Sequence, residues 1–94
     1  MNKYETVFIV KNDISEEQIR EKISNIEELI VKNGKITKAE NLGLKKLAYA
    51  VKKYTQGYYY IIEFESKPEL IIELERIYRI TEEILKFIVV RKDD

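Results

Sequence analysis

The sequence predicts an α+β protein in which one four-stranded antiparallel sheet carries two helices on a single face. Three observations support this prediction. Four separate runs are rich in β-branched and aromatic residues, which favour strands. Two segments between them repeat apolar residues every three or four positions, as amphipathic helices do. The resulting order is β-α-β-β-α-β, and right-handed crossovers assemble its two split βαβ units into the ferredoxin-like fold.

The first strand is predicted over residues 4–10, YETVFIV, and we expect it to be largely buried on both faces. Ser15 and Gln18 then form a capping box that begins the first helix. Isoleucines spaced by four, three and four positions give this helix one apolar stripe: Ile19, Ile23, Ile26 and Ile30. Asn33 and Gly34 end the helix, because both residues tolerate the left-handed conformation of a C-cap.

A long β segment follows from Ile36 to Tyr54, and Gly43 inside it predicts a bulge or bend. We expect the hairpin turn at residues 54–57, YTQG, and a return strand over residues 58–65. Alternation along this strand defines two faces. One face carries Tyr58, Tyr60, Ile62 and Phe64, and the other carries Tyr59, Ile61, Glu63 and Glu65.

Ser66 and Glu69 predict a second capping box, with Pro68 in the first turn of the second helix. The apolar stripe of this helix comprises Leu70, Leu74, Ile77 and Tyr78. The helix breaks at Thr81, and the last strand covers residues 84–91, ILKFIVVR. In the predicted sheet the first and third strands are central, the second and fourth lie at the edges, and the face without helices is left open for a partner.

Composition limits the classes of function. The chain has 94 residues, 45% of them hydrophobic, which suits a single domain over residues 1–94 with a compact core. It contains no cysteine and no histidine, so disulfides, thiol chemistry and the commonest metal ligands are excluded. The N-terminus, MNKYETVFIV, lacks the apolar region of a signal peptide, and no apolar run approaches the ~18 residues of a membrane span. We therefore expect a cytoplasmic protein without cofactor or metal.

No arrangement typical of an enzyme is present. Adjacent or alternate carboxylates occur at Glu16/Glu17, Glu27/Glu28, Glu63/Glu65, Glu82/Glu83 and Asp93/Asp94, and we expect them on solvated surfaces. The glycines are scattered rather than gathered in a phosphate-binding loop, and a catalytic triad cannot form without histidine. Acylphosphatase-type enzymes share this topology, but residues 11–13, KND, supply neither the arginine nor the glycine that their phosphate-binding loop needs.

Charge is segregated along the chain although the formal net charge is zero. Residues 13–30 have six acids and two bases, a net charge of −4, and residues 63–85 have seven acids and three bases, again −4. Residues 31–54 have one glutamate and seven lysines, a net charge of +6. These lysines are Lys32, Lys35, Lys38, Lys45, Lys46, Lys52 and Lys53. Because electrostatic fields act locally, such a block can attract a polyanion even in a neutral protein.

Two interpretations of the basic and aromatic residues remain open. The lysines could protect an edge strand from aggregation, or they could contact nucleic-acid phosphates as point charges. Tyr59 could stack on a base from the open face, while Tyr58 and Tyr60 pack beneath the helices. The RNA-recognition-motif signature matches residues 56–63 only in part, because Glu63 stands where an aromatic residue is required. We therefore do not assign a base-stacking domain.

Several motifs together resemble the bacterial small-subunit ribosomal protein S6 (S-six) family. They are YE at residues 4–5, GLKKLAY at 43–49, GYY at 57–59, ERIYRI at 75–80 and VVR at 89–91. The resemblance spans Lys3 to Lys92. Two positions depart from the family pattern, with Leu42 in place of a tryptophan and Ala50 in place of a proline; neither changes a charge.

The resemblance implies a ferredoxin-like, non-enzymatic constituent of the small ribosomal subunit. Such a protein binds the central domain of small-subunit ribosomal RNA together with ribosomal protein S18 (S-eighteen), a small basic partner. The acidic helices would then face away from the RNA or toward this partner. We further expect a monomer when the protein is free. The alternative from another class is a non-ribosomal ferredoxin-like interaction or ligand-sensing module that dimerises through its sheet.

Candidate contacts follow from this resemblance. The lysines expected to supply charge to the RNA are Lys45, Lys46, Lys52 and Lys53. Additional expected RNA contacts are Lys3, Tyr4, Arg79, Lys86, Arg91 and Lys92. For Tyr4, stacking on a base or ribose and packing in the core both remain open. The interface with the protein partner is expected to include Leu42, Leu44 and Tyr59.

Overall fold

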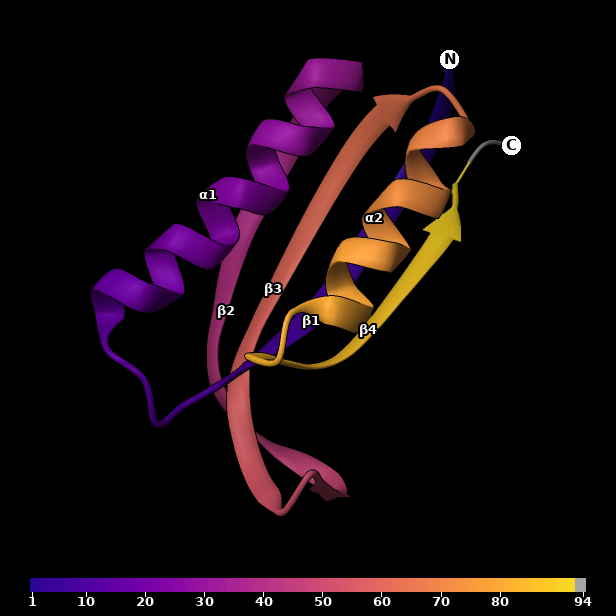
Figure 1. Ribbon diagram of the computed structural model, residues 1–94. Coiled ribbons are helices and arrows are strands. Elements are labelled where there is room, and N and C mark those ends of the chain that lie inside the picture. Colours follow the sequence, from indigo (N-terminus) through magenta and orange to yellow (C-terminus); the bar gives the residue numbers. More distant parts are fainter. Residues whose placement is uncertain (93–94) are drawn as a thin grey trace.

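The computed structural model describes residues 1–92, and the predicted carboxylate pair Asp93/Asp94 lies outside them. Its elements are β1 (Asn2–Lys11), α1 (Glu16–Asn33), β2 (Gly34–Val51), β3 (Tyr54–Ser66), α2 (Glu69–Ile80) and β4 (Ile84–Arg91). The strands form one antiparallel sheet in the order β2-β3-β1-β4, and both helices cover the same face (Figure 1). The predicted ferredoxin-like architecture, with the first and third strands in the centre, is confirmed. Within the described residues no helix is long and apolar enough to cross a membrane.

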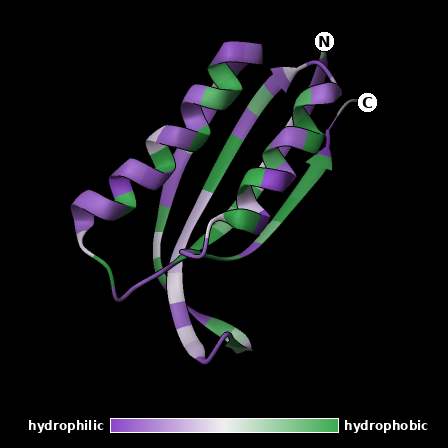
Figure 2. Cartoon of the chain, viewed as in Figure 1, coloured by the Kyte–Doolittle hydropathy of each residue, from purple (hydrophilic) through white to green (hydrophobic). Residues whose placement is uncertain are grey.

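The core lies between the sheet and the helices, and its centre is Phe8 of β1, which is fully buried. The Phe8 ring packs 5.6 Å from the ring of Tyr60 on β3 and 5.4 Å from that of Tyr78 on α2, measured between centroids. Tyr58 also packs against this core, so the predicted position of Tyr58 and Tyr60 beneath the helices is confirmed. Figure 2 shows mostly hydrophilic residues along α1, as the amphipathic pattern requires, whereas α2 also exposes Ile72 and Ile80.

One buried polar pair joins α2 to the centre of the sheet. The hydroxyl of Thr6 on β1 donates to the carbonyl oxygen of Ile88 on β4 at 3.0 Å and lies 2.8 Å from the hydroxyl of Tyr78. Because the single hydroxyl proton of Thr6 is already used, Tyr78 must be the donor in the second bond. Burial raises the pKa of the Tyr78 phenol well above its usual value, since a phenolate would be desolvated there.

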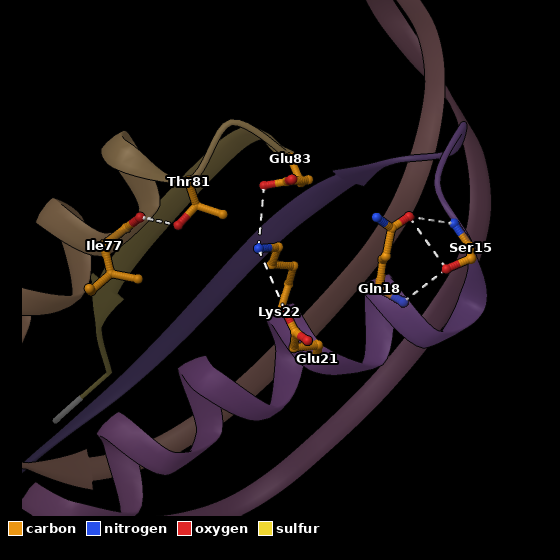
Figure 3. A network of polar contacts seen from close by, with 7 residues as sticks. All are labelled: Ser15, Gln18, Glu21, Lys22, Ile77, Thr81 and Glu83. Carbon is orange, nitrogen blue, oxygen red and sulfur yellow. Dashed lines mark hydrogen bonds and ion pairs between the residues drawn. The ribbon is translucent and has the colours of Figure 1, made fainter.

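The predicted capping box at the start of α1 is present. The backbone N–H of Gln18 donates to the Ser15 hydroxyl at 3.2 Å, and the Gln18 side-chain oxygen accepts from the Ser15 backbone N–H at 3.1 Å (Figure 3). The same close-up shows Lys22 of α1 beside Glu83, with 3.7 Å between the ammonium nitrogen and the carboxylate oxygen. This ion pair links α1 to the loop that precedes β4.

The C-terminal end of α1 differs from the prediction. Gly34 has a φ of 178°, which is extended rather than left-handed, so a left-handed C-cap was wrong. The glycine is needed for a different reason. Gly34 lies opposite Ser66 in the β2–β3 register, and a Cβ built on Gly34 would lie 1.9 Å from the Glu65 carbonyl oxygen. The close approach of the two backbones, which no local pattern reveals, therefore excludes a side chain.

The second predicted capping box is also wrong. β3 continues through Ser66, which is fully buried and donates its hydroxyl to the Lys67 carbonyl oxygen at 3.1 Å. Pro68 takes the N-cap position of α2 and provides no side-chain cap. The predicted break at Thr81 is confirmed, because the Thr81 backbone is extended rather than helical. The Thr81 hydroxyl donates to the carbonyl oxygen of Ile77 at 2.6 Å (Figure 3).

The hairpin turn lies earlier than predicted. Residues 54–57 belong to β3, and the turn consists of Lys52 and Lys53, whose φ angles are 50° and 73°. A two-residue hairpin loop of this kind requires positive φ, for which glycine and asparagine are the usual residues, so a Lys-Lys turn carries no compositional signal. The predicted irregularity at Gly43 is confirmed: its φ is 86°, and the strand register shifts between Asn41 and Gly43.

Gly34→Ala should lower the free energy of unfolding by about 2–3 kcal/mol, because the new methyl group would overlap the β3 backbone. Gly43→Ala is the matched control, since a Cβ there meets no atom within 4 Å and only the positive φ is strained. We expect a smaller loss for the control, about 1–2 kcal/mol. Urea unfolding measures both variants. An equal or larger loss for Gly43→Ala would contradict the backbone contact at Gly34.

Tyr78→Phe should lower the free energy of unfolding by about 0.5–1.5 kcal/mol near neutral pH, because one buried hydrogen bond is lost. Above pH 10.0, the ordinary pKa of tyrosine, the unfolded chain loses the Tyr78 proton while the folded protein retains it. The wild-type protein should therefore lose stability faster than Tyr78→Phe as the pH rises further. Unfolding curves for both proteins over this pH range test whether the stability advantage of the wild type shrinks as the pH rises. Parallel pH profiles would show that Tyr78 does not titrate differently in the folded state.

Candidate nucleic-acid interface

The hairpin formed by β2 and β3 extends past the neighbouring strand. The last residue of β1, Lys11, lies opposite Gly57, so residues 54–56 of β3 have no partner in β1. We call residues 45–56 the hairpin arm. In Figure 1 the arm projects beyond the ends of β1 and β4 and bends at its tip. The sequence produces this projection because β2 and β3 contain 18 and 13 residues, whereas β1 and β4 contain 10 and 8.

The arm carries four of the lysines predicted to contact RNA. Lys45 and Lys46 lie opposite Gly57 and Gln56, and Lys52 and Lys53 form the turn. All four are exposed. Among residues 1–92 no carboxylate forms an ion pair with any of them. The arm is therefore a local region of uncompensated positive charge.

Three more predicted contacts lie at the opposite end of the sheet, where the two termini meet (Figure 1). They are Lys3, Arg91 and Lys92. The ammonium of Lys92 lies 2.9 Å from a carboxylate oxygen of Glu5, and this hydrogen bond raises the pKa of Lys92. Arg91 donates to the side-chain oxygen of Asn2 at 3.1 Å. The structure thus separates these three residues from the arm, and two of them, Arg91 and Lys92, already have intramolecular partners.

Arg79 and Lys86 also have intramolecular partners. Arg79, near the end of α2, pairs with Glu75 at 3.5 Å, and its guanidinium carbon lies 6.0 Å from the ring centroid of Phe87. Lys86, on β4, contacts Tyr49 of the hairpin arm: its ammonium donates to the Tyr49 hydroxyl at 2.8 Å. Lys86, which was predicted to contact RNA, therefore contacts the hairpin arm.

Tyr4 occupies the core rather than the surface. Only 7% of it is exposed, and its ring stacks on Phe64 with 5.5 Å between centroids. Its hydroxyl accepts a hydrogen bond from the Asn2 side chain at 3.2 Å. Of the two roles left open by the sequence, packing is the one that this environment supports, because the ring has no exposed face for a base.

The three residues predicted to meet a protein partner do not share one surface. Leu44 lies opposite Tyr58 and so points to the side of the sheet that carries the helices, whereas Tyr59 points to the open face. Leu42 is the extra residue of the bulge between Asn41 and Gly43. The two leucines are 39% and 47% exposed, and Tyr59 is half-buried. A partner that contacts all three would have to reach around the edge of β2.

The hairpin arm covers part of the sheet face that carries no helices, which the sequence did not predict. The hairpin arm lies against it and forms an apolar hollow. Residues lining the hollow include Val7, Ile9, Leu47, Tyr49, Val51 and Ile88. The alternation of Leu47, Tyr49 and Val51 was the available signal, because it gives the arm one apolar side.

Comparison with known proteins identifies relatives over nearly the whole chain. The family described as Ribosomal protein S6 matches residues 3–91. Two relatives named small ribosomal subunit protein bS6, from Helicobacter acinonychis and Helicobacter pylori, are 47% and 46% identical over 94 and 92 residues. These matches cover 99% and 97% of this chain, but only 66% and 65% of the relatives, so the chain spans just under two-thirds of their length.

Solved structures give the same result. The crystal structure of 30S ribosomal protein S6 from Thermotoga maritima superposes with a TM-score of 0.91 at 33% identity, over 97% of this chain and 87% of that one. These relatives are named as ribosomal proteins of the small subunit and not as enzymes. The names favour the ribosomal interpretation over a dimerising ligand-sensing module. With a shared fold, shared motifs and a match over nearly its whole length, the chain belongs to the bacterial ribosomal protein S6 family.

Proposed function

We propose that this chain is a constituent of the bacterial small ribosomal subunit that binds the central domain of small-subunit ribosomal RNA together with ribosomal protein S18. The observation that carries the proposal is the hairpin arm. Four exposed lysines lie on it without a neutralising carboxylate among residues 1–92, in a chain that belongs to a ribosomal protein family. Such a region favours a polyanion, and ribosomal RNA is the polyanion that the family membership indicates.

Recognition on the arm depends on the RNA backbone rather than on base identity. Lysine ammonium groups bind phosphates as point charges and carry little sequence information. Tyr4, Tyr58 and Tyr60 do not change this, because Tyr58 and Tyr60 pack against the core and Tyr4 stacks on Phe64. Tyr59, the candidate for base stacking, lines the hollow beneath the arm. Specificity then comes from the shape of the folded RNA, which must place phosphates where the arm lies.

The second basic group suggests contact with a separate stretch of RNA. Lys3, Arg91 and Lys92 lie at the end of the sheet away from the arm, and the molecule is 37 Å long. The ion pair between Lys92 and Glu5 must be broken or shared before a phosphate binds, which weakens this group relative to the arm. We therefore assign the arm the larger part of the electrostatic attraction.

A cationic partner explains how a chain with zero net charge can take part in an RNA complex. The helix layer is acidic, with glutamates such as Glu16, Glu17 and Glu28 exposed on α1, and it would be repelled by RNA. We propose that this layer faces away from the RNA and that S18 supplies further positive charge. The free protein is a monomer on this view, and its affinity for RNA depends on the partner.

Lys45→Gln combined with Lys46→Gln should weaken RNA binding and reduce its salt dependence. The slope of log K against log salt should fall by about 0.7–0.9 for each lost phosphate contact. The matched control is Lys32→Gln combined with Lys67→Gln, which removes the same charge from exposed lysines outside the arm. Binding to a central-domain RNA fragment, measured with S18 present at several salt concentrations, tests both. Equal slopes for the two double variants would remove Lys45 and Lys46 from the interface.

The isolated protein should bind the same RNA fragment weakly, and addition of S18 should tighten binding by about 5- to 150-fold, the usual range of coupling between two ligands. Titration of the RNA with this protein, with and without S18, measures the factor. Tight and salt-insensitive binding of the isolated protein would contradict a shared interface, because the neutral chain would then need no cationic partner.

A further inference from the structure

The middle of the hairpin arm is not held by the β2–β3 ladder. The register passes from Lys46 opposite Gln56 directly to Val51 opposite Tyr54. Residues 47–50, LAYA, therefore face a single residue of β3, Thr55. In a regular hairpin the ladder fixes the position of the tip, but a bulge of this size lets the strand bend and twist. Contacts outside the ladder must determine where the tip lies.

Those contacts reach a strand that is not a neighbour of β2. The sheet order places β3 and β1 between β2 and β4. Nevertheless the Lys86 ammonium on β4 donates to the Tyr49 hydroxyl at 2.8 Å and lies 4.9 Å from the centroid of the Tyr49 ring. This combines a hydrogen bond with a cation–π contact. The Lys52 ammonium adds a second link, because it donates to the Ile84 carbonyl oxygen of β4 at 3.4 Å.

Apolar and polar contacts on the rest of the arm support the same position. Leu47 and Val51 line the hollow with Val7 and Ile88, so the inner side of the arm is partly desolvated. Beside the turn, at the tip of the arm, the Tyr54 hydroxyl donates to an Asp13 carboxylate oxygen at 2.6 Å. Lys86 has its pKa raised by the bond to Tyr49, which means that the charged ammonium is the form this contact stabilises.

We propose that Tyr49 and Lys86 are positioning residues, which hold the bent hairpin arm across to β4 so that its lysines meet RNA phosphates in a fixed arrangement. This inference rests on the proposed RNA-binding function and changes the role of Lys86, which acts through the arm rather than by touching phosphate itself. Fixing the arm before binding removes part of the ordering cost that a mobile loop would incur on the RNA.

The first test uses the free protein and does not depend on RNA. Tyr49→Leu keeps an apolar side chain but removes the ring and hydroxyl, and Lys86→Met keeps the aliphatic stem but removes the charge. We expect backbone ¹⁵N order parameters of residues 47–53 to fall below about 0.6, the range of flexible segments, in either variant. Lys86→Arg should retain an ordered arm, because arginine also donates hydrogen bonds and stacks on aromatic rings. Unchanged order in both Tyr49→Leu and Lys86→Met would overturn the proposal, whatever the protein binds.

The second test is a double-mutant cycle on RNA affinity, with the central-domain fragment and S18. Each single variant should weaken binding by about 2- to 5-fold, the factor expected for an exposed cation–π pair. The double variant should be no weaker than either single one, because both remove the same contact. The salt slope should stay at the wild-type value in every case, as no phosphate contact is lost.

A direct phosphate contact gives a different pattern. Lys86→Met would then lower the salt slope by about 0.7–0.9 while Tyr49→Leu left the affinity unchanged, and this result would overturn the positioning role. Lys67→Met is the control for charge alone, since Lys67 is exposed and lies outside the arm. If the wild-type protein with S18 fails to bind the RNA, the proposed function fails, and the order parameters still decide whether Tyr49 and Lys86 hold the arm.

Discussion

The double pairing of β1 fixes the centre of the sheet and the position of α2 on it. β1 forms ladders with β3 on one side and β4 on the other, and Phe8 at its centre meets rings from β3 and α2. The Thr6 hydroxyl of the same strand connects the β4 backbone to the Tyr78 hydroxyl of α2. A strand that is hydrogen-bonded on both edges and packed on the helix side cannot shift without exposing this core. The sheet, α2 and the loop before β4 are therefore fixed relative to one another.

The limited length of β1 produces the feature on which the proposed function depends. Because β1 ends opposite Gly57, the hairpin arm continues without a β1 partner and extends beyond the part of the sheet that the acidic helices cover. Positive charge there serves two purposes at once. It discourages pairing of an exposed edge with another chain, and it attracts an anionic backbone. The two interpretations of the lysines left open by the sequence are thus compatible, since both require the same exposed, uncompensated charges.

Prediction from sequence succeeded where structure follows local periodicity and failed where it follows contacts between distant residues. The isoleucine stripe and the Ser15–Gln18 box correctly located α1, because a helix and its cap depend on residues within one or two turns. The turn was misplaced, because Lys52 and Lys53 adopt positive φ without the glycine or asparagine that normally marks it. Gly34 was explained incorrectly, since its neighbour in space, Glu65, lies 31 positions away in the printed sequence. The candidate site shows the same division: the arm lysines were named, whereas the Tyr49–Lys86 contact was not.

The sequence by itself determined the order of the strands and helices, their buried faces, the clustering of lysines between residues 31 and 54, and the family to which the chain belongs. Residue spacing and composition are enough to predict these properties, because neither depends on how the chain folds back on itself. Only the tertiary structure decided that the lysine-bearing hairpin bends over the open face and reaches β4. That geometry depends on a hydrogen bond between residues 37 positions apart, on strands that are not adjacent in the sheet. No local pattern encodes such a contact, because its energy exists only after β1 has brought β3 and β4 together.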